Sequence, residues 1–307
     1  MTLAAQHKFT LYGVIAILLW SSLTALIREI SELFSPIGGA ALIYSVSSVC
    51  LIAVMGLPKF KQFSARYLLL GGLLFVSYEV FFSLALGLAK DRQQSVEIAI
   101  INYLWPALTI LFAVILARKK IHILVFPSIL LAFVGVAWCI SGDQGFSISQ
   151  IITNISHNPL AYGMAFTGAI IWAAYCNLAK GMGETSNPIP LFFIATAISL
   201  WIQFAISNEP ALTFTFSSSF KLLIVAMVMG AGYALWNNAI IGGNMILLGT
   251  FSYFTPIFAS IFSALYLNVQ LSSHFWQGVG LVTFASLVCF IVTREKPSQQ
   301  NRSIEIQ

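Results

Sequence analysis

Apolar residues form a series of long runs along the chain, separated by short segments rich in charged residues, Pro and Gly. These runs lack the alternation of polar and apolar positions that is typical of membrane β-strands. Runs of about twenty apolar residues can cross a bilayer as helices, whose backbone groups are hydrogen-bonded internally. The pattern therefore predicts an all-helical (all-α) integral membrane protein with ten spans. We expect these spans at 10–28, 36–56, 66–88, 94–117, 121–141, 159–180, 188–207, 219–241, 244–267 and 274–293.

Composition supports this class of protein. Of 307 residues, 59% are hydrophobic and 8% are charged, whereas about 25% of the residues in a soluble domain are charged. The first run is expected to be a retained helix, because no small-residue cleavage site follows it. The four cysteines lie inside apolar runs without a CxxC spacing, so we expect buried thiols and neither disulfides nor zinc.

Two similar segments, 150 residues apart, suggest an internal repeat. The segment at 102–106 reads Asn-Tyr-Leu-Trp-Pro, and the segment at 252–256 reads Ser-Tyr-Phe-Thr-Pro. Further matched pairs are Cys139/Cys289, Tyr78/Tyr233, Gly87/Gly242 and Trp20/Trp172. Because each copy has an odd number of spans, the second copy is inverted, as in many secondary transporters. We expect two inverted five-helix repeats around a central cavity: 1–141 and 159–293, with a connecting loop at 142–158 and a tail at 294–307.

Orientation follows from the basic residues that flank the runs. One side of the membrane would hold 11 of the 15 Lys and Arg residues, namely Lys8, Lys59, Lys61, Arg66, Arg118, Lys119, Lys120, Lys180, Arg294, Lys296 and Arg302. The other side would hold Arg28, Lys90, Arg92 and Lys221. The positive-inside rule therefore predicts that both termini are cytoplasmic. Since these flanks account for the net charge of +5, no nucleic-acid partner is expected.

Acidic residues are rare inside the runs, and Glu79 is the most informative. It lies near the middle of the run at 66–88, where an acid costs roughly 2.5–3.5 kcal/mol on insertion scales unless it faces a wet cavity or a partner. It either binds a substrate ammonium or a coupling proton in a cavity, or ties helices together through hydrogen bonds. Glu97 lies in the first turn of the next run, where it would favour the helix macrodipole at a wet rim.

The two repeated prolines have a mechanical consequence. A proline inside a helix removes the hydrogen bond to the carbonyl four residues earlier. Pro106 would therefore free the carbonyl of Asn102, and Pro256 would free that of Ser252. These positions are either ordinary kinks or symmetric hinges with freed acceptors aimed at a shared cavity.

Aromatic and amide side chains cluster in the same runs, too deep for an interfacial belt. The aromatic ones are Trp20, Tyr78, Tyr103, Trp105, Trp172, Tyr175, Tyr233, Trp236 and Tyr253, and the amides are Asn177, Asn237 and Asn238. They either pack helices together or line a pocket that offers ring stacking and a surface for a cation. The histidines lack metal-ligand spacing, and no Walker A sequence or catalytic constellation is present. No metal, cofactor, ATP use or enzyme activity is expected.

Several segments together resemble a known family. They are Leu18-Leu-Trp-Ser21, Leu74-Phe-Val-Ser-Tyr-Glu79, Asn102-Tyr-Leu-Trp-Pro-Ala-Leu-Thr-Ile110, Ile171-Trp-Ala-Ala-Tyr-Cys176, Ser252-Tyr-Phe-Thr-Pro256 and Phe275-Trp-Gln-Gly278. In these the chain resembles the drug/metabolite transporter superfamily, whose repeat unit is called the EamA domain, and especially its bacterial aromatic amino acid exporters. The resemblance implies a secondary exporter of Phe, Tyr and Trp in the inner membrane, with a cavity lined by spans 1, 3, 4, 6, 8 and 9.

A role can be assigned to each candidate substrate-binding residue. We expect ring walls from Trp20, Tyr78, Trp105, Trp172 and Tyr175, with Tyr103, Tyr233 and Tyr253 in the same cavity. Glu79 and the freed carbonyls would accept from the ammonium, and Asn102, Asn177 and Asn238 would donate to the carboxylate; Pro106 and Pro256 would be hinges. The expected partners are aromatic amino acids and the lipid bilayer, and the protein is expected to be a monomer. The alternatives are an exporter of lipophilic cations or other drugs, and a membrane receptor or assembly subunit without transport.

Overall fold

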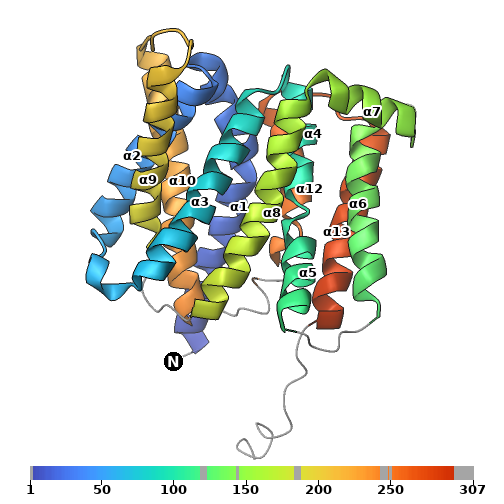
Figure 1. The fold of residues 1–307 in the computed structure, drawn as a ribbon, viewed down its shortest axis with the longest axis horizontal. Coiled ribbons are helices and arrows are strands. Elements are labelled where there is room, and N and C mark those ends of the chain that lie inside the picture. The colour runs from blue at the N-terminus through green and yellow to red at the C-terminus, as the bar shows by residue number, and fades with distance from the viewer. Residues whose placement is uncertain are drawn as a thin grey trace, which may run out of the picture.

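The computed structural model describes residues 3–117, 123–142, 145–182, 188–242, 248 and 251–293, and within these ranges the regular structure is entirely helical (Figure 1). The helices are α1 (Leu3–Leu33), α2 (Pro36–Met55), the 3-10 turn η1 (Phe60–Gln62), α3 (Ala65–Gly87), α4 (Arg92–Asn102), α5 (Trp105–Ala117), α6 (Val125–Ile140), α7 (Ile148–His157), α8 (Pro159–Met182), α9 (Ile189–Ile206), α10 (Phe216–Gly242), α12 (Thr255–Tyr266) and α13 (Ser273–Thr293). Among the described residues, eight candidate membrane spans are long and apolar enough to cross a bilayer, and two shorter apolar helices accompany them.

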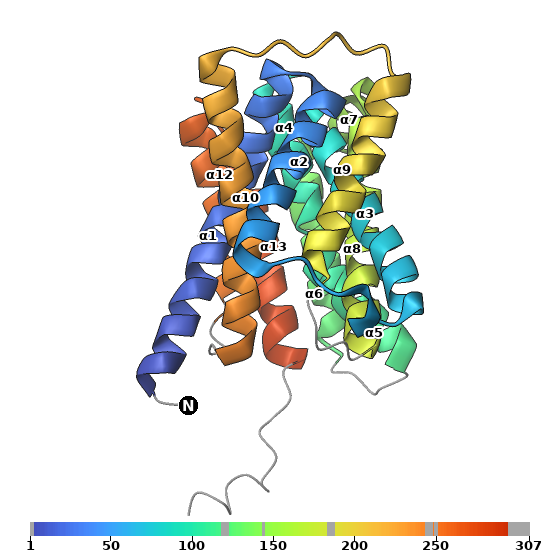
Figure 2. The same cartoon turned by 90° about the vertical axis from the view of Figure 1, so that its left-hand side faces the viewer.

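The long helices run side by side between two ends of the molecule. The helix α1 begins and α13 ends at what we call the lower end (Figure 1). The extended segment between α9 and α10 crosses the opposite, upper end (Figure 2). Short polar side chains begin several helices by accepting a backbone N–H: Ser64 caps α3, and Asp91 caps α4 through Gln94 N at 2.7 Å.

Helices from before residue 142 pack chiefly against helices from after residue 158. The most extensive pairs are α1 with α10, α2 with α9, α3 with α8, and α6 with α13. In the last pair two glycines allow the backbones to approach closely, since a Cβ placed on Gly278 would lie 2.7 Å from the carbonyl oxygen of Gly135. The two parts of the chain therefore form one interleaved bundle.

The structure differs from the sequence prediction in two of the predicted elements. The run at 94–117 is two helices, because α4 ends at Asn102 and Pro106 lies in the first turn of α5, where a missing N–H is harmless. A matching break at 253–254 precedes α12, while residues 243–247 and 249–250 of that run lie outside the described part.

The sequence predicts a connecting loop at 142–158. The structure shows that this segment contains the helix α7. Its isoleucines at 148, 151, 152 and 155 follow the helical period. All residues of α7 are at least partly exposed. The predicted tail at 294–307 lies outside the described residues.

Candidate functional site

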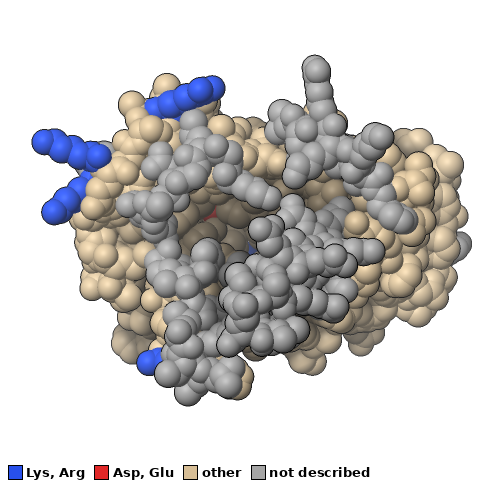
Figure 3. Space-filling view, turned by 90° about the horizontal axis from the view of Figure 1, so that it is seen from below, with Lys and Arg blue, Asp and Glu red and all other residues tan. Residues whose placement is uncertain are grey.

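A cavity of about 310 Å³ lies among α1, α3, α4, α5, α8, α10, α12 and α13. Small-molecule sites typically have volumes of about 300–1,000 Å³. The candidate residues that line it are Trp20, Tyr78, Glu79, Asn102, Tyr103, Trp105, Trp172, Tyr233, Tyr253, Pro106 and Pro256. The bundle is hollowed when seen from the lower end, and acidic side-chain atoms are visible inside the hollow (Figure 3).

Two aromatic pairs face the cavity. The rings of Trp20 on α1 and Tyr233 on α10 have centroids 5.3 Å apart, and Trp236 extends this pair at 5.2 Å from Trp20. The rings of Tyr78 on α3 and Trp172 on α8 have centroids 4.5 Å apart. Each pair joins one helix from before residue 142 to one from after residue 158, so the cavity has an aromatic surface on both of these helix pairs.

Glu79 is held by two tyrosines while it lines the cavity. Its side chain is buried, and its Oε1 accepts a hydrogen bond from the Tyr233 hydroxyl at 2.7 Å. Its Oε2 accepts one from the hydroxyl of Tyr44 on α2 at 2.5 Å. The carboxyl therefore ties α3 to α2 and α10, and because it also lines the cavity, its binding of an ammonium or a proton stays a prediction.

The amide of Asn102 has an unused acceptor at the edge of the cavity. Its Nδ2 donates to the Tyr78 hydroxyl at 3.3 Å, and its Oδ1 is buried without a hydrogen-bond partner among the described residues. The sequence assigned Asn102 as a donor to a carboxylate. One N–H of this amide is used by Tyr78 and the oxygen is left without a donor among the described residues, so the role of Asn102 as a donor to a carboxylate stays a prediction.

The two helix breaks differ in their carbonyl groups. At the second break the hydroxyl of Thr255 donates to the carbonyl oxygen of Ser252 at 2.5 Å. The expectation of a free carbonyl at Ser252 is therefore wrong. The equivalent residue at the first break is Trp105, which has no hydroxyl, and Pro106 supplies no N–H to the carbonyl of Asn102.

Three candidate residues are not among the cavity-lining residues. Tyr175 is buried, stacks on Trp172 with centroids 5.1 Å apart, and lies with its hydroxyl 3.4 Å from that of Tyr67. The Asn177 amide donates to the carbonyl oxygens of Thr109 at 3.0 Å and Ala173 at 2.9 Å.

Asn238 is exposed and donates to the carbonyl oxygen of Ala234 at 2.9 Å. The physical reason is helical rotation of about 100° per residue. On α8 the lining residues Trp172 and Cys176 lie four positions apart on one face, and Asn177 is rotated by about 100° from Cys176, while on α10 Asn238 is rotated by about 200° from Trp236. The side chain of Asn237 lies outside the described residues.

Sequence reasoning also missed several lining residues that a stricter use of helical periodicity would have found. Residues four apart lie on one helix face. Thr24 follows Trp20 by four positions, Phe82 follows Tyr78, and Cys176 follows Trp172; all of these line the cavity. Tyr44 could not be found in this way, because its contact with Glu79 joins two different helices.

The buried Glu97 and the four cysteines lie in helices. Glu97 is buried and accepts a hydrogen bond from the Tyr162 hydroxyl at 3.1 Å, so its expected place in a wet rim is wrong. The four cysteines are unpaired; two are buried, whereas Cys50 and Cys176 are half-buried. No cluster of three or more metal-ligating side chains occurs in the part of the chain that the structure describes.

Comparison with known proteins identifies relatives along nearly the whole chain. The chain is 43% identical to the aromatic amino acid exporter YddG of Salmonella typhimurium over 95% of this chain and 99% of the relative. It is 44% identical to the exporter of the same name from Escherichia coli, over 94% and 99%. A solved crystal structure that covers 94% of this chain, and 98% of its own, has the same fold, with a TM-score of 0.68 at 21% identity.

Residues 159–291 match the EamA-like transporter family. With its apolar helices, the chain is thus a multi-pass membrane protein whose relatives are exporters. It belongs to the EamA-like transporter family and, within it, to the group of the YddG exporters.

Proposed function

We propose that this protein is a secondary transporter that exports aromatic amino acids across the bacterial inner membrane by alternating access. The observation that carries the proposal is a cavity with two aromatic pairs and one buried carboxyl. An aromatic amino acid needs an apolar surface for its ring and an acceptor for its ammonium, and this cavity offers both. Relatives of 43% and 44% identity named as aromatic amino acid exporters support the same cargo.

The packing of the bundle supports ten spans in two inverted five-helix repeats, 1–141 and 159–293. Exchanging the repeats would exchange Trp20 with Trp172 and Tyr233 with Tyr78, which converts one aromatic pair into the other. The same exchange turns the α1–α10 packing into the α8–α3 packing and leaves the α2–α9 and α6–α13 pairs in place. The family match over 159–291 supports the second repeat as a unit.

The charges at the two ends support a cytoplasmic lower end, where both termini would lie. Lys and Arg side chains project from the left-hand part of the lower end in the view of Figure 3. Three of the four basic residues assigned to the outside, Arg28, Arg92 and Lys221, are paired with acids at the opposite end. With this orientation, we propose that the hollow at the lower end corresponds to an inward-open state.

We propose a specific binding mode for the substrate. Its ring lies between the pairs Trp20–Tyr233 and Tyr78–Trp172, which present ring faces and edges. Its ammonium donates to Glu79 and to the unused Oδ1 of Asn102. A cation that satisfies a buried, unpaired acceptor removes the desolvation cost of that acceptor, which favours the bound state.

Counterflow of labelled tryptophan in proteoliposomes tests the proposal. Glu79→Gln keeps the shape of the side chain but removes the negative charge, so we expect uptake to fall about tenfold, the effect of losing a hydrogen bond to a charged group. Glu97→Gln is the matched control, because Glu97 is also a buried glutamate but does not line the cavity. Equal uptake by Glu79→Gln and the parent protein would contradict the binding role of Glu79. A parent protein that moves no labelled tryptophan would contradict the function.

A second candidate function is export of lipophilic cations. A carboxyl beside aromatic rings also suits a cation without a carboxylate. Competition separates the two cargoes: excess phenylalanine should suppress tryptophan counterflow. If a cationic dye suppresses it and phenylalanine does not, the cation exporter is the better description.

A further inference from the structure

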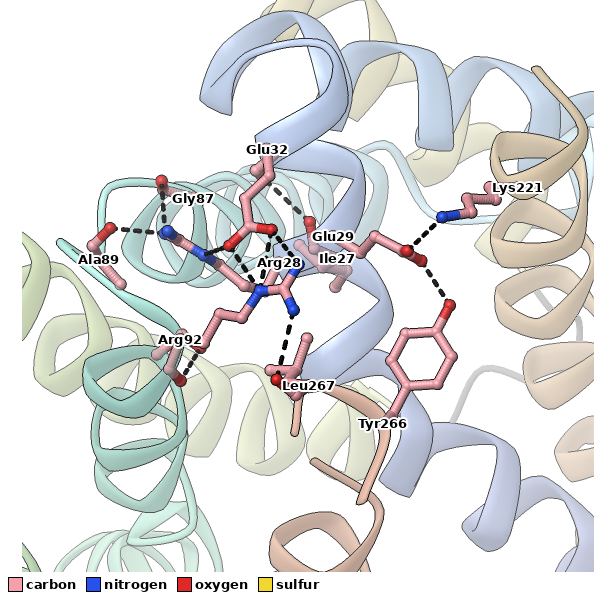
Figure 4. A network of polar contacts seen from close by, with 12 residues as sticks. Ile27, Arg28, Glu29, Glu32, Gly87, Ala89, Arg92, Lys221, Tyr266 and Leu267 are labelled. Carbon is pink, nitrogen blue, oxygen red and sulfur yellow. Dashed lines mark hydrogen bonds and ion pairs between the residues drawn. The ribbon is translucent and has the colours of Figure 1, made fainter. Parts of the chain in front are cut away.

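A set of charged and polar side chains joins the helices at the upper end, opposite the hollow (Figure 4). We call it the upper-end network; its members are Arg28, Glu29, Glu32, Arg92, Lys221 and Tyr266. On α1 the network begins where the cavity ends, since Ile27 lines the cavity and Arg28 is the next residue. The network therefore covers the side of the cavity that faces the upper end.

One part of the network surrounds Glu32. Its Oε1 accepts from Arg28 Nε at 2.9 Å, and its Oε2 accepts from Arg92 Nη2 at 2.7 Å. The buried Arg28 is fixed by the end of α3, because its Nη1 donates to the carbonyl oxygens of Gly87 at 3.2 Å and Ala89 at 2.5 Å. These bonds all lie among α1, α3 and α4, within the first proposed repeat.

The other part crosses between the two proposed repeats. Glu29 on α1 accepts from Lys221 Nζ on α10 at 2.7 Å, and its second oxygen accepts from the Tyr266 hydroxyl on α12. Arg92 on α4 adds a bond from Nη1 to the carbonyl oxygen of Leu267, just after α12, at 3.3 Å. Separation of the repeats at the upper end would break these contacts and leave the Arg28 contacts intact.

We propose that Glu29, Lys221 and Tyr266 form the outer latch of the transporter, joined when the cavity opens at the lower end and separated when it opens at the upper end. This inference rests on the proposed alternating access. The side chain of Lys221 is 39% exposed and that of Glu29 is 13% exposed. Ion pairs with such solvent access are weak, so the latch biases the equilibrium between states without locking it.

Labelling of Cys176 from each side of the membrane tests the latch. Cys176 is half-buried and lines the cavity, and Cys50→Ser removes the other half-buried thiol of the four cysteines. A membrane-impermeant maleimide is applied to right-side-out and inside-out vesicles. Loss of the latch by Lys221→Gln should raise labelling from the outer side about two- to fivefold, as expected for one weak ion pair. Labelling from the inner side should fall correspondingly.

The exposed Lys90 provides the matched control, since Lys90→Gln also removes one positive charge at the upper end. The charge-exchanged variant Glu29→Lys with Lys221→Glu restores the ion pair but not the acceptor for Tyr266, so it should recover part of the parent labelling, which distinguishes loss of the pair from a folding defect. Unchanged outer labelling in Lys221→Gln, or no recovery in the exchanged variant, would overturn the latch. Tryptophan counterflow by the parent protein is measured separately. Its absence would overturn the proposed cargo, even if labelling still responded to the latch.

Discussion

The two helix breaks at the cavity differ in what replaces the backbone N–H that each proline lacks. Each proline removes a backbone N–H, but the second break replaces it locally, because Thr255 donates to the carbonyl oxygen of Ser252. The first break has Trp105 at that position and cannot do so. It also brings to the cavity the Oδ1 of Asn102, which has no partner among the described residues. The first break therefore leaves an acceptor open at the cavity, whereas the carbonyl at the second break is already hydrogen-bonded.

The surroundings of the breaks extend this difference. Asn102 is hydrogen-bonded to Tyr78, which precedes the cavity carboxyl Glu79 on α3. Tyr233, which corresponds to Tyr78 in the other part of the chain, precedes Ala234. The cavity carboxyl of Glu79 and the cavity amide of Asn102 thus both lie in the first proposed repeat, whereas both repeats contribute aromatic surface.

The largest expected difference in transport is between substitutions of Asn102 and Ser252, the polar residues that precede the two helix breaks. Asn102→Ala removes the acceptor that we assign to the substrate ammonium, so tryptophan counterflow should fall about tenfold, as for a lost bond to a charged group. Ser252→Ala leaves the carbonyl of Ser252 bonded to Thr255 and should reduce counterflow no more than about twofold.

Asn102→Asp provides the control, because it keeps an acceptor oxygen at the same place. It should retain more counterflow than Asn102→Ala. Equal losses in Asn102→Ala and Ser252→Ala would show that the two breaks contribute alike, and the asymmetry of recognition would be wrong.

A smaller difference is expected between the two prolines. Pro106→Ala supplies an N–H that can bond the carbonyl of Asn102 and so join α4 to α5, which would turn the Asn102 side chain away from its present position. We expect counterflow to fall about fivefold, the size of a misplaced hydrogen bond. Pro256→Ala adds a donor where Thr255 already serves the carbonyl, so the loss should stay below about twofold.

Circular dichroism of the purified variants checks the structural part of this prediction. Helix content should rise slightly in Pro106→Ala, as the break closes. A transport defect of equal size in both proline variants would mean that the breaks act as equivalent hinges.

The helices could be predicted from the sequence because a lipid-facing helix is specified by local composition. Long apolar runs predict the helical class, and the prolines at 106 and 256 predict kinks or hinges near the cavity, although not the division of the run at 94–117 into two helices. The short helix α7 was missed because its ten residues fell in a segment judged only by its polarity. Four isoleucines at helical spacing were the signal that could have identified it.

The sequence predicts those site residues that stand out within a single helix, but not the contacts that join different helices. Trp20, Tyr78 and Glu79 were identified because polar and aromatic residues are conspicuous inside apolar runs. The sequence does not specify which face of α8 turns inward, so its polarity predicts Asn177 in the cavity, whereas Cys176 is the residue that lines it. The hydrogen bonds from Tyr44 to Glu79 and from Asn102 to Tyr78 each join two different helices, and no local pattern in the sequence specifies such contacts.

The smallest expected effect is on stability at the second break. Thr255→Val keeps the shape of the side chain but removes the donor to Ser252. A half-buried carbonyl without its partner should cost about 1 kcal/mol of folding free energy, and the melting temperature should fall by about 2 °C. Thr255→Ser retains the hydroxyl and should melt like the parent protein in a thermal-shift assay. If Thr255→Val is as stable as Thr255→Ser but transports poorly, the Thr255 hydroxyl serves the substrate instead of the backbone, and the second break is a recognition element like the first.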